Sequence, residues 1–385
     1  MHPAWAVAAV LAAGSAMLWL PAYAQAPHEM LVYFGTYTKE ASKGIYVSRL
    51  DTTSGALGAP QLAAPTENPS FLAVHPTGRF LYAVNETRAF EGKPTGAVSA
   101  FAVDRASGRL SLLNMQPSGG ADPAHLVVDR SGRNTLVANY TGGSVTVLPI
   151  GDDGKLKPAS AFIQHQGSGK DPERQKGPHA HGIALDAANR FAYVADLGLD
   201  KVLIYRFDPA AGTLAAGAPG FGLVAAGSGP RHVALRPDGR FAYVINEMAC
   251  TITAFGVDQR NGGLTQLQTI TTLPSGQERA RGYSTAEIAV HPSGRFLYGS
   301  NRGHDSIAVF AIEPAAGTLT PVEHEPTQGS TPRGFGIDPS GAWLLVGNQR
   351  SDSVVVFRID AKTGALGPTD HQVAVGSPVS VEFVR

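Results

Sequence analysis

The chain has 385 residues, of which 45 are glycine and 27 are proline, a composition typical of a β-rich protein with many turns. Its 31 Lys and Arg residues balance 31 Asp and Glu residues, so we expect no basic surface for nucleic acid or anionic lipid. A single cysteine, Cys250, excludes an internal disulfide framework, and we expect it to be a buried structural thiol.

The N-terminal segment has the features of a secretory signal peptide. Residues 4–20 are continuously apolar or small, and Pro21-Ala22-Tyr23-Ala24 offers an Ala-x-Ala cleavage site, although no Lys or Arg precedes the apolar run. We therefore predict a signal peptide over residues 1–24. An uncleaved membrane anchor is the alternative, but the run is short for a full span. A cleaved signal implies a periplasmic or secreted protein without stable membrane insertion.

One pattern then recurs through the chain. In its first copy, Asn68-Pro69-Ser70 opens a strand, His75-Pro76-Thr77-Gly78 forms a turn, and residues 80–85 form a second strand. We expect His75, and likewise His291, to be structural. A period of about 50 residues built from short strands is typical of a β-propeller with one four-stranded blade per repeat. The six turns lie at Gly78, Gly132, Asn189, Gly239, Gly294 and Gly341.

Each copy continues into an outer hairpin, as in Asp208-Pro209-Ala210-Ala211-Gly212-Thr213-Leu214, and no stretch has a sustained helical period. The seventh copy is divided between the two ends of the chain, because residues 377–384 start it and residues 31–37 continue it. Pairing these segments closes the ring and removes two free sheet edges. We predict an all-β, seven-bladed propeller as a single domain over residues 25–385, and a closed ring of this kind is expected to be a monomer.

Aligning the copies places equivalent residues in rings around one mouth of the channel. The ring at the end of the second strand is nearly uniform, and Asn or Asp there is expected to cap the strand end. Neighbouring rings are not uniform, and charges that break a repeat at one rim predict a site grafted onto the scaffold. The alternative is a channel entrance lined by solvated polar residues. The residues that break the repeat are His181, Arg231, Glu247, Arg302 and Arg333, with Tyr37, Glu86 and His232 beside them.

The segment Gly177-Pro178-His179-Ala180-His181 is the sharpest local motif. His-x-His in a strand is also metal-ligand spacing, but no Cys or third His accompanies it and the mouth is rich in arginine. We therefore expect neither a metal nor another cofactor. A polar, glycine-rich segment, residues 164–176, precedes the motif, and insertions of this kind often decorate the functional face.

These motifs carry a resemblance that covers the chain from about Met30 to its end. The chain is similar to the lactonase-type seven-bladed propellers, which include the bacterial 6-phosphogluconolactonases and the fungal carboxy-cis,cis-muconate lactonizing enzymes. The resemblance implies catalytic roles for His181 or His179, Arg231, Glu247 and Arg302. The matching motifs are Phe34-Gly35-Thr36-Tyr37-Thr38, Pro178-His179-Ala180-His181, Asp196-Leu197-Gly198-Leu199-Asp200-Lys201-Val202, Gly229-Pro230-Arg231-His232, Asn246-Glu247 and Ser300-Asn301-Arg302-Gly303.

We therefore expect a hydrolase that opens a sugar lactone. Glu247 or His181 would activate water, and Arg231 and Arg302 would hold the oxyanion. The substrate-binding candidates are His179, His232, Arg333, Glu86 and Tyr37. Export weakens the case for a phosphorylated, cytosolic substrate and makes an unphosphorylated aldonolactone plausible. Three alternatives remain open: a muconate-type lactonizing cyclase, a metal-dependent lactonase, and a non-catalytic propeller that binds glycans or proteins.

Overall fold

The computed structural model describes residues 1–2, 28–38 and 41–384. The predicted signal peptide lies outside these residues except for Met1 and His2, so it stays a prediction. Within the described residues, 28 strands form seven four-stranded antiparallel sheets. The same residues contain no helix that is long and apolar enough to cross a bilayer. The predicted all-β, seven-bladed propeller is confirmed.

Each sheet is one blade, and its first strand lines the channel. In the first three blades the strands are β4 (Leu72–Val74), β5 (Phe80–Asn85), β6 (Ala97–Val103) and β7 (Leu110–Pro117); β8 (Pro123–Val128), β9 (Asn134–Asn139), β10 (Ser144–Pro149) and β11 (Ala161–Gln164); and β12 (Ala180–Leu185), β13 (Phe191–Asp196), β14 (Lys201–Asp208) and β15 (Thr213–Leu223).

The next three blades repeat this order. Their strands are β16 (Pro230–Leu235), β17 (Phe241–Asn246), β18 (Thr251–Val257) and β19 (Leu264–Thr271); β20 (Ser284–Val290), β21 (Phe296–Arg302), β22 (Ser306–Ile312) and β23 (Leu319–Pro326); and β24 (Pro332–Ile337), β25 (Trp343–Asn348), β26 (Ser353–Ile359) and β27 (Leu366–Ala374).

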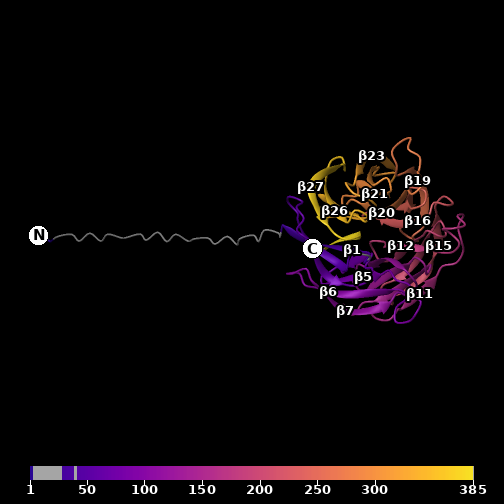
Figure 1. Ribbon diagram of the computed structural model, residues 1–385, viewed down its shortest axis with the longest axis horizontal. Coiled ribbons are helices and arrows are strands. Elements are labelled where there is room, and N and C mark those ends of the chain that lie inside the picture. Colours follow the sequence, from indigo (N-terminus) through magenta and orange to yellow (C-terminus); the bar gives the residue numbers. More distant parts are fainter. Residues whose placement is uncertain (3–27, 39–40, 385) are drawn as a thin grey trace.

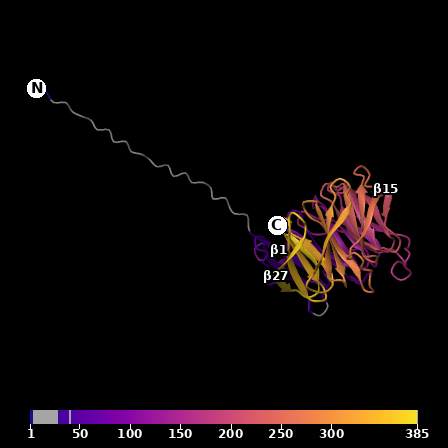
Figure 2. The same cartoon turned by 90° about the horizontal axis from the view of Figure 1, so that it is seen from above.

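The seventh blade joins the two ends of the chain. Its order is β28 (Pro378–Val384), β1 (Glu29–Thr36), β2 (Gly44–Asp51) and β3 (Gln61–Pro65), and β28 pairs with β1 from Leu31↔Val384 to Gly35↔Ser380. In Figure 1 the colours run once around the ring, so the indigo β1 lies beside the yellow C-terminus. Figure 2, turned by 90°, again places β1 near the C-terminus and β15 on the opposite side of the ring. The predicted closure is confirmed.

Among the described residues, the core consists of seven apolar clusters, one between each pair of neighbouring blades. Second strands such as β5, β9 and β13 are buried along their whole length, because both faces of each sheet pack against a neighbouring blade. The two structural histidines bind across the same boundaries, because Nε2 of His75 donates to the Gly132 carbonyl (3.0 Å) and Nε2 of His291 donates to the Gly341 carbonyl (2.9 Å). Cys250 is buried, which raises the pKa of its thiol to about 11.

The nearly uniform polar ring, which is expected to cap the strand ends, joins three blades to the loops that precede them. In the blades that begin with β8, β20 and β24, the Asn amide at the end of the second strand donates to a carbonyl in the loop that leaves the preceding blade. The pairs are Asn139 with Ser118 (3.0 Å), Asn301 with Thr272 (2.8 Å) and Asn348 with Thr327 (2.9 Å).

A buried tyrosine also links neighbouring blades. The hydroxyl of Tyr298 donates to the Gly364 carbonyl in the outer turn of the next blade at 2.7 Å, and Tyr33, Tyr82 and Tyr243 make the equivalent bond. Tyr193 occupies the same position in its blade, but among the described residues its buried hydroxyl has no hydrogen-bond partner.

This difference predicts opposite outcomes for one substitution. Tyr298→Phe should lower the free energy of unfolding by about 1 kcal/mol, because the hydrogen bond is lost and the Gly364 carbonyl stays buried. Tyr193→Phe should leave stability unchanged or raise it slightly, because only an unpaired hydroxyl is removed. Urea unfolding of both variants checks this pair. Equal losses would show that the tyrosine ring, not its hydrogen bond, joins the blades.

Candidate active site

Glu247 lies at the centre of the mouth, directly after β17. Its backbone N–H donates to the Gly229 carbonyl (2.7 Å), which fixes the residue beside the start of β16. Its Oε1 accepts a hydrogen bond from Nη2 of Arg174 (2.7 Å), and its Oε2 lies 3.0 Å from Nη2 of Arg302 and 3.2 Å from Nε of Arg231. Three guanidiniums therefore share one carboxylate that is only 7% exposed.

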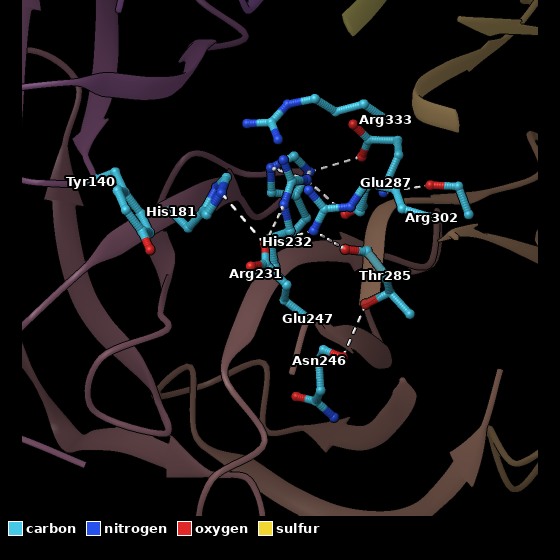
Figure 3. A network of polar contacts seen from close by, with 12 residues as sticks. Tyr140, His181, Arg231, His232, Asn246, Glu247, Thr285, Glu287, Arg302 and Arg333 are labelled. Carbon is cyan, nitrogen blue, oxygen red and sulfur yellow. Dashed lines mark hydrogen bonds and ion pairs between the residues drawn. The ribbon is translucent and has the colours of Figure 1, made fainter. Parts of the chain in front are cut away.

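The two inner arginines are also held by the backbone of β20. Nη2 of Arg302 donates to the Thr285 carbonyl (2.7 Å), and Nη1 of Arg231 donates to the Ala286 carbonyl (2.7 Å). Figure 3 shows both guanidiniums converging on Glu247, Arg231 from β16 and Arg302 from β21 of the next blade. The structure brings Arg231, Glu247 and Arg302 together, as the alignment of the repeats predicts. The alignment places them at the rim of the channel, whereas in the structure Arg231 is only 3% exposed.

Arg174 is the residue that the sequence reasoning missed. It comes from residues 165–179, between β11 and β12, which form the longest connection between two successive blades. The neighbouring Gln175 anchors this segment, because its buried amide donates to the Leu197 carbonyl (2.7 Å) and to Oδ1 of Asp200 (2.9 Å). The length of this segment indicated that it lies on the functional face. Nothing in the sequence distinguished Arg174 from the other polar residues of the segment.

The two histidines of the His-x-His motif have different surroundings. His181 lies in β12, 4% exposed, with its Nε2 4.0 Å from Oε2 of Glu247. Its Nδ1 is buried without a hydrogen-bond partner among the described residues. His179 lies farther out, where its ring stacks on Tyr140 at 4.7 Å and its Nδ1 contacts the Tyr140 carbonyl at 3.0 Å. His181 is therefore the imidazole next to the carboxylate.

The protonation states follow from burial and charge. Burial alone would favour the neutral acid, but Arg302, Arg231 and Arg174 outweigh it and lower the pKa of Glu247 to about 2. Burial and then the charge of Arg231 lower the pKa of His181 well below its ordinary value. Burial and the nearby Arg333 and Arg302 lower the pKa of Arg231 to about 9, which is still above neutral pH. At pH 7 the site holds a carboxylate, a neutral imidazole and charged guanidiniums.

A second cluster adjoins this centre. Tyr37, directly after β1, donates its hydroxyl hydrogen to Oε2 of Glu86 (2.8 Å) and accepts a hydrogen bond from Nη2 of Arg333 (2.8 Å). The Arg333 guanidinium also lies over the Tyr37 ring, 5.3 Å from its centroid. Within the described residues, Arg333 forms no ion pair with a carboxylate. One small cavity is lined by this cluster and by Arg231 and His232.

The mouth as a whole carries an excess of positive charge. Its four guanidiniums, from Arg174, Arg231, Arg302 and Arg333, face the carboxyl groups of Glu247, Glu86 and Glu287. In the part of the chain that the structure describes, no three His, Cys, Asp or Glu side chains form a group that could hold a metal ion. The arrangement can stabilise an oxyanion and retain an anionic product, with an unprotonated base beside it.

Comparison with known proteins identifies the family of this chain. Over residues 31–383 the chain matches the family described as Lactonase, 7-bladed beta-propeller. It is 36% identical over 297 residues to the 6-phosphogluconolactonase of Bacillus subtilis, covering 77% of this chain and 81% of that one. The structure of the periplasmic gluconolactonase of Pseudomonas aeruginosa is 37% identical, has a TM-score of 0.86, and the match covers 93% of this chain and 99% of that one. The chain therefore belongs to the lactonase family of seven-bladed β-propellers, as the resemblance in its motifs predicts.

Proposed function

We propose that this protein is a hydrolase that opens a sugar lactone, with its active site at the mouth that contains Glu247. The observation that carries the proposal is a pair of guanidiniums, the buried Arg231 and the partly buried Arg302, held by one carboxylate beside the neutral imidazole of His181. Lactone hydrolysis needs a base for water, a positive charge for the tetrahedral oxyanion and an acid for the ring oxygen. These residues can supply all three.

His181 suits the role of base better than Glu247. Both oxygens of the Glu247 carboxylate already face guanidiniums, Oε1 that of Arg174 and Oε2 those of Arg231 and Arg302, so little capacity remains to take a proton from water. The imidazole of His181 is unprotonated, and the Glu247 carboxylate 4.0 Å away would stabilise the imidazolium that forms when it accepts a proton. Glu247 would then orient the guanidiniums and the imidazole rather than attack water itself.

The reaction would proceed in two steps. Water adds to the lactone carbonyl carbon as His181 takes its proton, and the oxyanion is stabilised by Arg231 and Arg302. The bond from that carbon to the ring oxygen then breaks, and the imidazolium returns the proton to the leaving alkoxide. The hydroxy acid ionises to a carboxylate among the arginines. The same groups could serve the reverse reaction, which is lactonisation.

We propose an unphosphorylated aldonolactone, such as glucono-lactone, as the substrate, and a periplasmic or secreted location. The predicted signal peptide supports export, and the relative from Pseudomonas aeruginosa is called a periplasmic gluconolactonase. The relative from Bacillus subtilis is called a 6-phosphogluconolactonase, so the 6-phospho ester is the competing substrate. Hydrolysis of glucono-lactone, 6-phosphoglucono-lactone and muconate lactones, each measured against the buffer rate at pH 7, would distinguish these substrates. No activity on any of them would refute the proposal.

Replacing Arg302 gives a first test of the site. Arg302→Ala should lower kcat/KM at least tenfold, equivalent to about 1.4 kcal/mol of barrier, because one charge that faces the oxyanion is removed. Its thermal stability should change little, since Glu247 keeps its ion pairs with Arg231 and Arg174. Steady-state kinetics and a melting curve check both parts. Full activity in this variant would remove Arg302 from the mechanism.

Removing divalent metal should leave the activity intact. The guanidiniums of Arg231 and Arg302 would repel a divalent cation from the position beside Glu247. Activity after treatment with excess EDTA should therefore match that of the untreated enzyme. A large loss that calcium or zinc restores would favour the metal-dependent alternative.

A further inference from the structure

The connection between β11 and β12, residues 165–179, is held at both of its ends by one buried carboxylate. At its start the buried ring of His165 donates from Nδ1 to Oδ2 of Asp196, the last residue of β13 (2.6 Å). At its end the backbone N–H of His179 donates to Oδ1 of Asp196 (2.7 Å). In the blades that begin with β8, β20 and β24, an Asn at this position donates to a loop carbonyl. A carboxylate only accepts, so Asp196 binds N–H groups of the connection instead.

Gln175 holds the middle of the connection. Its amide nitrogen donates to the Leu197 carbonyl (2.7 Å) and to Oδ1 of Asp200 (2.9 Å). Its amide oxygen accepts the backbone N–H of Asp171 (2.9 Å). These partners fix the orientation of the amide, because the carbonyl and the carboxylate only accept and the backbone N–H only donates. The side chain is 1% exposed, and its nitrogen and oxygen both have partners, as a buried amide requires.

The turn between β13 and β14, residues 197–200, is shaped to receive the connection. A Cβ atom on residue 198 would collide with the backbone carbonyl oxygen of Gly177, so glycine at this position lets the two segments approach each other. The two acceptors of the Gln175 amide lie on either side of Gly198. The sequence motif of residues 196–200, to which the proposed reaction gives no role, is therefore the contact surface that anchors the connection.

The anchored connection places Arg174 on Glu247. Oδ1 of Asp171 accepts the backbone N–H groups of Glu173 and Arg174 (2.8 Å each), and the carbonyl of Asp171 accepts that of Gln175 (3.0 Å). The backbone of Arg174 is thus fixed within a tight turn. From this turn, Nη2 of Arg174 donates to Oε1 of Glu247 (2.7 Å).

This contact gives the two oxygens of Glu247 different partners. Oε2 lies 3.0 Å from Nη2 of Arg302, 3.2 Å from Nε of Arg231 and 4.0 Å from Nε2 of His181. Among the described residues, Oε1 has no hydrogen-bond partner besides Arg174. Without Arg174 the carboxylate could rotate about its last carbon–carbon bond, and Oε2 would no longer be fixed beside the three groups of the proposed mechanism.

We infer that Arg174 is a positioning residue of the active site: anchored on the β13–β14 turn through Gln175, it holds Oε1 of Glu247 and so keeps Oε2 on the inner guanidiniums and the imidazole. The inference rests on the proposed hydrolase function, in which Glu247 orients those groups. It gives a role to the long connection and to the motif of residues 196–200.

A double-mutant cycle tests this role by steady-state kinetics on the preferred lactone. Arg174→Ala should lower kcat by about tenfold or more while KM changes by less than about threefold, because an interaction that matters in the transition state is weakened. Gln175→Met, similar in size but without the amide, should lower kcat by about fivefold. The double variant should be within about twofold of Arg174→Ala, since Gln175 acts through Arg174. Losses that multiply, or full activity in Arg174→Ala, would overturn the inference.

Gln268 offers a matched control. Its amide also links two segments, because it donates to the Leu319 carbonyl (3.1 Å) and accepts the Leu319 backbone N–H (2.7 Å), but it lies in β19, the outermost strand of its blade. Gln268→Met should therefore leave kcat and KM within about twofold of those of the natural enzyme. An equal loss of turnover in Gln268→Met and Gln175→Met would show that Gln175 acts on the fold as a whole, and would also overturn the inference.

Hydrogen exchange measures the anchoring without a substrate. Residues 169–175 should exchange slowly in the natural protein, and Gln175→Met should speed their exchange without changing that of the propeller strands. The hydrogen-bonded backbone N–H groups of this stretch include those of Gly169, Asp171, Glu173, Arg174 and Gln175. Fast exchange in the natural protein would overturn the inference even if Gln175→Met fails to fold, and so would equal exchange in the two proteins. If the stretch is protected and no lactone is hydrolysed, the proposed function fails while the anchoring of Arg174 stands.

Discussion

Replacing Glu247 with glutamine should lower kcat/KM at least a hundredfold, equivalent to about 2.7 kcal/mol of barrier. The amide keeps the size of the side chain but removes the charge that Arg174, Arg231 and Arg302 share. Without that charge the two inner guanidiniums repel each other and lose the orientation in which they face an oxyanion. The imidazolium of His181 would also lose the carboxylate that stabilises it. Steady-state kinetics on the preferred lactone measures the effect.

The same change should destabilise the fold. Removing one partner of a buried ion pair costs about 3 to 5 kcal/mol, because a charge is left uncompensated away from water. The cost here should fall at the lower end, since the side chain of Arg174 is 46% exposed and can turn towards solvent. The kinetic assay therefore belongs well below the melting temperature of the variant, and urea unfolding supplies the stability loss.

Glu382 offers a matched control in the same channel. Burial and then the nearby Glu287 raise the pKa of Glu382 to about 8, so at pH 7 this carboxyl group is largely neutral and glutamine mimics it. Glu382→Gln should keep kcat/KM, and its free energy of unfolding should stay within about 0.5 kcal/mol of that of the natural protein. If Glu247→Gln also kept its turnover, or if it bound a glycan as well as the unmodified protein does, a binding module would be the better description.

The fold can be predicted from the sequence because each blade of a propeller repeats the same pattern of strands and turns. The blade count follows from a seventh unit divided between residues 377–384 and 31–37, and the pairing of β28 with β1 confirms it. The same alignment predicts that Glu247 and Arg302 share a mouth, and they lie 3.0 Å apart. An alignment of repeats transfers position from blade to blade, so any residue inside the repeat can be located this way.

What lies outside the repeat could not be predicted in this way. Arg174 belongs to the long connection between β11 and β12, outside the repeated strands, and buried Gln175 anchors this segment while Arg174 contacts Glu247. The difference between His179 and His181 is that His181 lies in β12, whereas His179 precedes that strand and stacks on Tyr140. The burial of the site residues could not be predicted either, because an alignment of repeats gives the angular position of a side chain around the channel but not its exposure to solvent.

The imidazoles of His125, His181 and His232, of which His181 and His232 are buried, should make the protein sensitive to mild acid. The three rings lie close together, with His232 4.7 Å from His125 and 5.4 Å from His181. Burial, together with the charge of the nearby Arg231, lowers the pKa of each ring well below its ordinary value. In the unfolded chain each should titrate near pH 6.5.

The direction of the effect follows from proton linkage. Below about pH 6.5 the unfolded chain binds a proton at each of the three histidines and the folded protein does not, so falling pH favours unfolding. Each ring contributes roughly 1.4 kcal/mol per pH unit, and the three together roughly 4 kcal/mol per pH unit. Glu247 acts in a lower window: its contribution is complete above about pH 4.5 and is lost as the pH falls towards 2. Between pH 6 and 5 the loss of stability should therefore come mainly from the three histidines and not from Glu247.

Urea unfolding at a series of pH values between 7.5 and 5 tests this expectation. Stability should be nearly constant down to about pH 6.5 and then fall steeply. His125→Phe should reduce the slope by about a third, because one of three proton-binding sites is removed from the unfolded chain while a ring still packs against Phe71, 4.0 Å away in the natural protein. A flat profile, or stability that rises on acidification, would mean that these rings accept protons in the folded state. The neutral imidazole that the proposed mechanism assigns to His181 would then be lost as well, so this equilibrium measurement tests the chemistry of the site without a substrate.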